Sequence, residues 1–121
     1  MKDFDKLISY LLHSRTQAHT FHLQTKSYAE HVALNGYYDG IVALIDGLVE
    51  SYQGKHGIID KYSNFELESY RDNAQVIKYF ESLGKMVDKI GNSIPDRYLQ
   101  NQIDTITELI YSTTYKLKFL S

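Results

Sequence analysis

The chain has 121 residues, which is enough for one compact domain. Its 13 Lys and Arg residues against 15 Asp and Glu give a formal charge of −2, so no surface for neutralising DNA phosphates is indicated. Cysteine is absent, which excludes disulfides, zinc–thiolate sites, iron–sulfur clusters and a cysteine nucleophile.

The first apolar residues recur at three- and four-residue steps, as they do along one face of a helix. Leu7, Ile8, Leu11 and Leu12 follow this period and predict a helix over roughly residues 3–24. One proline and seven glycines are too few for an all-β chain with many tight turns. We therefore expect an all-α protein.

A polar stretch after this helix predicts a short turn into a second one. Ser27 is a candidate N-cap, because Glu30 follows it at the third position of a capping box. The second helix is expected from Tyr28 to Tyr52. Two glycines within residues 54–57 favour an end to the helix there.

The second half of the chain predicts two more helices. Residues 58–64 are expected to connect to a third helix over about residues 65–90, and Pro95 suits the first turn of a fourth. Four amphipathic helices with short links predict an antiparallel four-helix bundle, a single domain over residues 1–121. The start lacks a secretory signal, and no apolar run approaches the ~18 residues of a membrane span. We therefore expect a cytoplasmic protein with no membrane partner.

One side of the second helix carries a stripe of small residues. It consists of Ala29, Ala33, Gly36, Gly40, Ala43 and Gly47. Glycine inside a helix costs about 0.5–1 kcal/mol relative to alanine. The stripe predicts that another backbone approaches closely, either from the first helix or from a second subunit, although small residues can also align by coincidence.

A polar stripe of the same helix holds candidate metal ligands. It consists of His31, Asn35, Asp39, Asp46 and Glu50, and a solvated face would look the same. Asp46 and Glu50, however, place like charges four residues apart, which destabilises a helix unless a cation lies between them. Oxygen ligands with imidazole suit iron, manganese or zinc. His22 lies on the apolar face of the predicted first helix. It is either a metal ligand or a core histidine bonded to a backbone carbonyl.

The residues around these histidines resemble a known family. Residues 31–54 read HVALNGYYDGIVALIDGLVESYQG, and residues 18–23 read AHTFHL. The longer segment resembles the second helix of the Dps-like mini-ferritins of the ferritin superfamily, and the shorter one resembles the end of their first helix. The resemblance covers about a third of the chain, and it implies a ferritin-like bundle.

In that family an iron-oxidation site lies between two subunits. The resemblance places His22 and His31 of one subunit against Asp46 and Glu50 of its neighbour, in a homo-oligomer with a two-fold interface through the first two helices. Asn35 replaces the family's carboxylate four residues after the second histidine, and Leu23 replaces a tryptophan. The resemblance therefore implies an iron-binding protein with a degenerate site and at most weak ferroxidase-type activity.

Short chains of this kind also resemble small ferritin-like proteins of tailed bacteriophages, which places the protein in a bacterial or phage-infected host cytoplasm. The alternative function is a non-enzymatic helical oligomer that sequesters a small nucleotide-like signal or engages a host protein. Eleven tyrosines favour it, because their rings stack on bases and their hydroxyls bond phosphates. The candidate ligand-binding residues are Tyr37, Tyr38 and Tyr52, although tyrosines also line helical cores. No residues are assigned a catalytic role.

Overall fold

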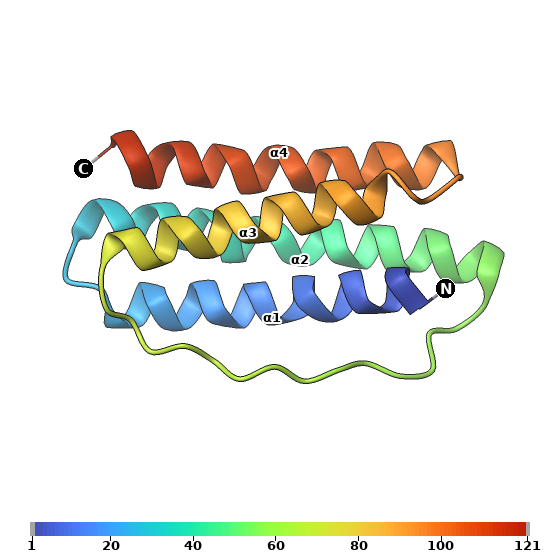
Figure 1. Cartoon of the computed structure of the whole chain (residues 1–121), viewed down its shortest axis with the longest axis horizontal. Helices are drawn as coiled ribbons and strands as arrows, with labels where there is room; N and C mark the ends of the chain where they lie inside the picture. Colours follow the sequence, from blue (N-terminus) through green and yellow to red (C-terminus); the bar gives the residue numbers. More distant parts are fainter. Residues whose placement is uncertain (1, 121) are drawn as a thin grey trace.

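The computed structural model describes residues 2–120, and every regular element among them is a helix. The helices are α1 (Lys2–Gln24), α2 (Tyr28–His56), α3 (Asn73–Gly91) and α4 (Arg97–Phe119) (Figure 1). The prediction of an all-α protein is confirmed.

The four helices pack side by side, and each contacts two antiparallel neighbours. α1 contacts α2 and α3, and α4 contacts the same two helices. Figure 1 shows why this order is possible: residues 57–72 run back along the whole molecule, so α2 and α3 point in the same direction. We call residues 57–72 the strap. The expectation of short links throughout is wrong at this connection.

The strap is extended because side chains of α1 hydrogen-bond to its backbone. The Ser63 amide donates to Ser9 Oγ at 2.9 Å, and the Tyr70 amide donates to Gln24 Oε1 at 2.8 Å. Gln17 binds Glu68 twice: its Oε1 accepts from the Glu68 amide at 2.7 Å, and its Nε2 donates to the Glu68 carbonyl at 3.0 Å.

These bonds replace the intrahelical bonds that a third helix starting at residue 65 would need, so that predicted start is wrong. The helix begins where Asp72 caps it, because the Asp72 carboxylate accepts from the Gln75 amide at 2.8 Å.

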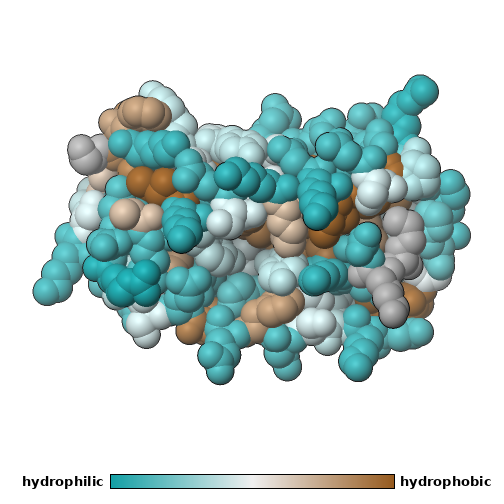
Figure 2. Space-filling model, in the orientation of Figure 1, coloured by the Kyte–Doolittle hydropathy of each residue, from teal (hydrophilic) through white to brown (hydrophobic). Residues whose placement is uncertain are grey.

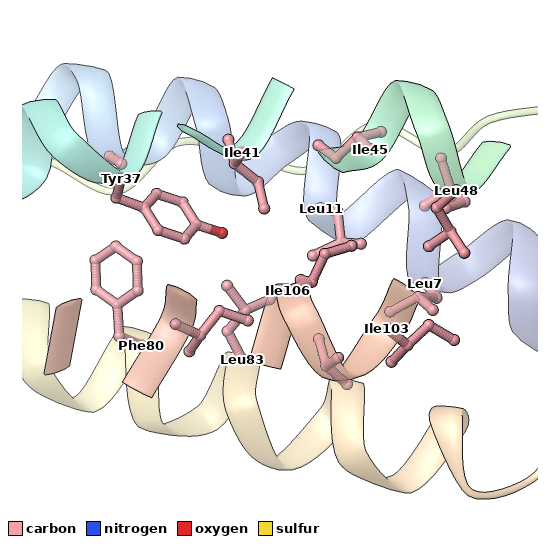
Figure 3. Close-up of a cluster of buried hydrophobic side chains, with 14 of the residues drawn as sticks. Leu7, Leu11, Tyr37, Ile41, Ile45, Leu48, Phe80, Leu83, Ile103 and Ile106 are labelled. Carbon is pink, nitrogen blue, oxygen red and sulfur yellow. The ribbon is translucent and has the colours of Figure 1, made fainter. Parts of the chain in front are cut away.

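The core runs along the centre of the bundle and takes side chains from every helix (Figure 3). At one end of this view Tyr37 and Phe80 face each other with ring centroids 4.8 Å apart. The Tyr37 hydroxyl is fully buried, and a 2.7 Å hydrogen bond joins it to Ser14 Oγ. The buried tyrosine is therefore satisfied inside the core.

The small residues of α2 lie against α4 rather than α1. A Cβ added at Gly40 would meet Leu109 Cδ2 at 3.4 Å, and one added at Gly47 would meet Gln102 Nε2 at 3.7 Å. Gly36 has nothing within 4 Å of that position. The prediction that the backbone of the first helix approaches these small residues is therefore wrong within one chain, because side chains of α4 lie next to Gly40 and Gly47.

The expectation that no apolar run approaches the length of a membrane span is wrong for α2. Its length and an 18-residue window of mean hydropathy 1.2 would suffice for a membrane span, and a third of that window is buried in the bundle. A core helix meets the same criteria, because its buried face must be apolar. The face of the molecule shown in Figure 2 is mainly hydrophilic, with scattered hydrophobic patches.

Candidate functional site

The two histidines predicted as metal ligands lie together where α1 ends and α2 begins. The rings of His22 and His31 stack with centroids 3.6 Å apart. His22 Nδ1 donates to the His31 carbonyl at 2.7 Å, and His31 Nδ1 donates to the His22 carbonyl at 3.0 Å. This reciprocal pair joins the two helices, and it agrees with the interpretation of His22 as a core histidine bonded to a backbone carbonyl.

Other polar groups of α1 and α2 continue the pair toward solvent. The Tyr38 hydroxyl donates to Asn35 Oδ1 at 2.6 Å, and Asn35 Nδ2 donates to Asp39 Oδ2 at 3.1 Å. The ring of His19 stacks on Tyr38 with centroids 4.3 Å apart. Asn35 is therefore occupied by its neighbours in this chain.

Asp46 and Glu50 do not reach the histidines within one chain. Both are exposed on α2, and Asp46 follows His31 by about 22 Å along the helix at 1.5 Å per residue. Among the residues that the structure describes, no group of three or more His, Asp or Glu side chains is placed to hold a metal ion. The iron site therefore stays a prediction that needs a second copy of the chain.

The three tyrosines predicted to bind a ligand have different surroundings. Tyr37 belongs to the core, and Tyr52 is buried with its ring stacked on Phe4 at 3.8 Å between centroids. Tyr38 is half-buried beside the histidines. The rings of Tyr37 and Tyr52 thus contact the protein itself in the single chain.

A groove that the sequence did not predict lies between α1 and α3. Of the neighbouring helix pairs, these two pack least closely. Two adjoining cavities of about 390 and 350 Å³ open there, and both are lined by Tyr10 and Met86. We call them together the α1–α3 groove. Its other lining residues are Asp3, Lys6, His13, Phe65, Glu68, Tyr79, Ser82, Leu83, Lys89, Ile90 and Ser93.

Four rings surround the larger cavity. Tyr10 of α1 stacks on Phe65 of the strap with centroids 4.3 Å apart and an 8° angle between planes. His13 approaches Phe65 edge-on at 5.7 Å and lies 6.3 Å from the Tyr79 ring of α3. The strap thus supplies one wall of an aromatic site that two helices complete.

The charges of the α1–α3 groove differ between its two ends. At the strap end, burial lowers the pKa of His13, and the nearby Glu68 carboxylate offsets part of this effect. Burial also raises the pKa of the Tyr79 hydroxyl. At the other end, Lys6 and Lys89 line the smaller cavity together with Asp3. The groove therefore has an aromatic end that includes the Glu68 carboxylate, and an end where the Lys6 and Lys89 ammonium groups outnumber the Asp3 carboxylate.

The sequence contained one usable signal for this site. Tyr79 and Met86, seven residues apart in the predicted third helix, follow the period of one helix face. Phe65 was assigned to that same helix, so its place beside Tyr10 could not be predicted.

Comparison with known proteins identifies the family. Residues 22–117 match the model of a family described as a family of unknown function (DUF5856). The chain belongs to this family. It is 28% identical over 113 residues to a protein of Enterobacteria phage T4 described as an uncharacterized 14.6 kDa protein in the mobD-ri intergenic region. The match covers 93% of this chain and 86% of the T4 protein. No solved structure matches the chain.

These matches overturn the resemblance to Dps-like mini-ferritins and to ferritin-like phage proteins. The DUF5856 match spans most of the chain, whereas the mini-ferritin resemblance rested on a third of it. Two of the residues that carried the resemblance have other partners, because His22 and His31 bind each other's backbone carbonyls. A third, Asp46, is exposed on α2. The similar T4 protein is a phage protein, so a likeness to a phage protein is the part of the expectation that the comparisons support.

Proposed function

We propose that this DUF5856 protein is a non-enzymatic binding protein that holds a nucleotide-like ligand in the α1–α3 groove. The observation that supports this proposal is the aromatic site formed by Tyr10, His13, Phe65 and Tyr79. Aromatic walls with a few placed polar groups are typical of small-molecule sites.

The two ends of the groove suit the two parts of a nucleotide. A base is planar and stacks on aromatic side chains, which is worth about 1–3 kcal/mol per base. His13, Tyr79 and Glu68 offer hydrogen-bonding groups for its edge. Lys6 and Lys89 place positive charge at the other cavity, where a phosphate would lie.

Calorimetric titration of the purified protein tests the proposal. We expect an adenine or guanine nucleotide to bind. Adenosine, which lacks the phosphate, and ribose 5-phosphate, which lacks the base, should each bind more weakly. Phe65→Leu removes one stacking ring and should weaken binding about 5- to 100-fold. Lys89→Met should weaken it through the phosphate, whereas Lys85→Met, an exposed lysine of α3 outside the groove, is the matched control.

Two results would count against the proposal. One is that no nucleotide, cyclic dinucleotides included, binds the wild-type protein. The other is that Phe65→Leu and Lys89→Met bind as tightly as the Lys85→Met control.

We also propose that the chain self-associates through the outer face of α1 and α2. Leu12 and Leu23, eleven residues apart, lie on one line of α1 and are 44% and 68% exposed. Val32 and Val42 of α2 are 49% and 38% exposed. Sedimentation should detect a dimer that Leu23→Glu converts to monomer. A wild-type monomer at high micromolar concentration would contradict this second proposal.

A further inference from the structure

A second site lies at the end of the molecule where α2 begins and α4 ends (Figure 1). Two adjoining cavities of about 170 and 380 Å³ open there, and both are lined by Ala29, Lys116 and Leu120. The smaller cavity also contacts Glu30, Tyr70 and Asn73. None of these residues lines the α1–α3 groove.

Glu30 is the unusual residue of this site. The residue is 4% exposed, and it lies in the first turn of α2. Its Oε1 accepts a hydrogen bond from the Thr25 hydroxyl, and Thr25 Oγ1 accepts in turn from the Ser27 amide at 3.1 Å. Its Oε2 is buried with no hydrogen-bond partner.

A carboxylate accepts several hydrogen bonds, and a buried acceptor left without a donor costs free energy. Oε1 has the neutral Thr25 hydroxyl as a donor, and the ion pairs among the described residues do not include Glu30. Burial raises the pKa of Tyr70, and its hydrogen bond to Glu30 and the negative charge of Glu30 add to this rise, which places the Tyr70 hydroxyl beside the Glu30 carboxylate. The Thr25 and Tyr70 hydroxyls next to the Glu30 carboxylate are neutral, so neither supplies a charge opposite to its own.

The opposite charge and an apolar space lie next to this carboxylate. Lys116 of α4 lines both cavities, and it too is absent from those ion pairs. The larger cavity is lined by Tyr28, Val32, Ala33 and Leu120, of which Tyr28 is 80% exposed. Figure 2 shows hydrophobic residues gathered at the end of the molecule where α4 finishes.

We propose that this site binds a small zwitterion with an apolar body, namely an α-amino acid with an apolar side chain. The ammonium group donates to Glu30 Oε2, the carboxylate pairs with Lys116, and the side chain enters the larger cavity. Hydrogen bonds to charged groups are stronger than neutral ones, so both charges of the ligand contribute. A simple cation would be repelled by Lys116, and a simple anion by Glu30.

Calorimetric and NMR titrations with leucine test the proposal. Isoamylamine lacks the carboxylate and 4-methylpentanoate lacks the ammonium group, so we expect both to bind at least tenfold more weakly than leucine. Glu30→Gln should weaken leucine binding about tenfold or more, because a neutral amide replaces the partner of the ammonium group. Lys116→Met should also weaken it. Lys118→Met, which removes a lysine of α4 paired with Glu81, should leave it unchanged.

A thermal melt of each variant shows whether it folds, and Lys116→Met, at an exposed residue, tests the site without touching the buried carboxylate. The proposal is overturned if leucine does not bind. It is equally overturned if folded Glu30→Gln and Lys116→Met bind leucine as well as Lys118→Met does, or if either half-ligand binds as tightly as leucine.

Discussion

The strap depends most on Gln17, whose replacement should both destabilise the protein and release residues 57–72. The Gln17 side chain is fully buried, and its amide makes two hydrogen bonds to the Glu68 backbone. Gln17→Leu keeps a similar volume but removes both bonds. It leaves the amide and the carbonyl of Glu68 without their partners.

The size of the effect follows from these contacts. Each hydrogen bond contributes about 0.5–1.5 kcal/mol net, so the two together contribute about 1–3 kcal/mol to the free energy of unfolding. For a domain of this length, that corresponds to a fall in Tm of about 4–15 °C. Gln24→Leu is the comparison, because exposed Gln24 makes one bond to the Tyr70 amide and should cost under about 1.5 kcal/mol.

Urea unfolding gives the stability change, and amide hydrogen exchange locates it. We expect the Glu68 amide to exchange faster in Gln17→Leu than in Gln24→Leu. Because Phe65 belongs to the same strap, nucleotide binding should weaken as well. A Gln17→Leu protein with wild-type stability and wild-type exchange at Glu68 would refute this account of the strap.

Three further predictions concern titration and the histidine pair. The pKa of Asp96 lies below 3.8 in the folded protein, mainly because Lys55 donates a hydrogen bond to its carboxylate. The ionised Asp96 therefore stabilises the fold above pH 3.8, and this stabilisation is lost as the pH falls through the pKa of the folded state. Melts between pH 2 and 6 should therefore show a steeper acid decline for wild type than for Asp96→Asn. Burial raises the pKa of Tyr37 above 10.0, so its contribution to stability is complete below pH 10 and falls at higher pH. In melts at alkaline pH, the Tm of Tyr37→Phe should therefore fall less with pH than the Tm of the wild type. His22→Phe keeps an aromatic ring but loses the hydrogen bond to the His31 carbonyl, so the free energy of unfolding should fall by about 1 kcal/mol in chemical denaturation. An unchanged free energy of unfolding would contradict the role of this hydrogen bond in joining α1 and α2.

The sequence predicted those helices whose boundaries are local. Ser27 caps α2 as expected, with its side chain accepting from the Glu30 amide, and Gly57, with a φ of 94°, ends the helix. The start of α3 could not be predicted in this way. Phe65 and Tyr70 continue the helical period of the residues after them, but Gln17 and Gln24 bind this backbone from a distant part of the chain.

The candidate sites were predictable to a smaller extent. The pairing of His22 with a backbone carbonyl was one of two interpretations left open, and a residue's position on a helix face does not decide between them. The α1–α3 groove combines Tyr10, Phe65 and Tyr79 from three separate segments. Side chains that meet only through the path of the strap leave no local pattern in the sequence.

The binding proposal is tested most directly by an NMR titration of the labelled protein with a purine nucleotide. We expect the largest chemical-shift changes at Tyr10, Phe65, Tyr79 and Lys89, and we expect these changes to saturate as nucleotide is added. Shift changes confined to other residues, or a spectrum unaltered at millimolar nucleotide, would contradict it.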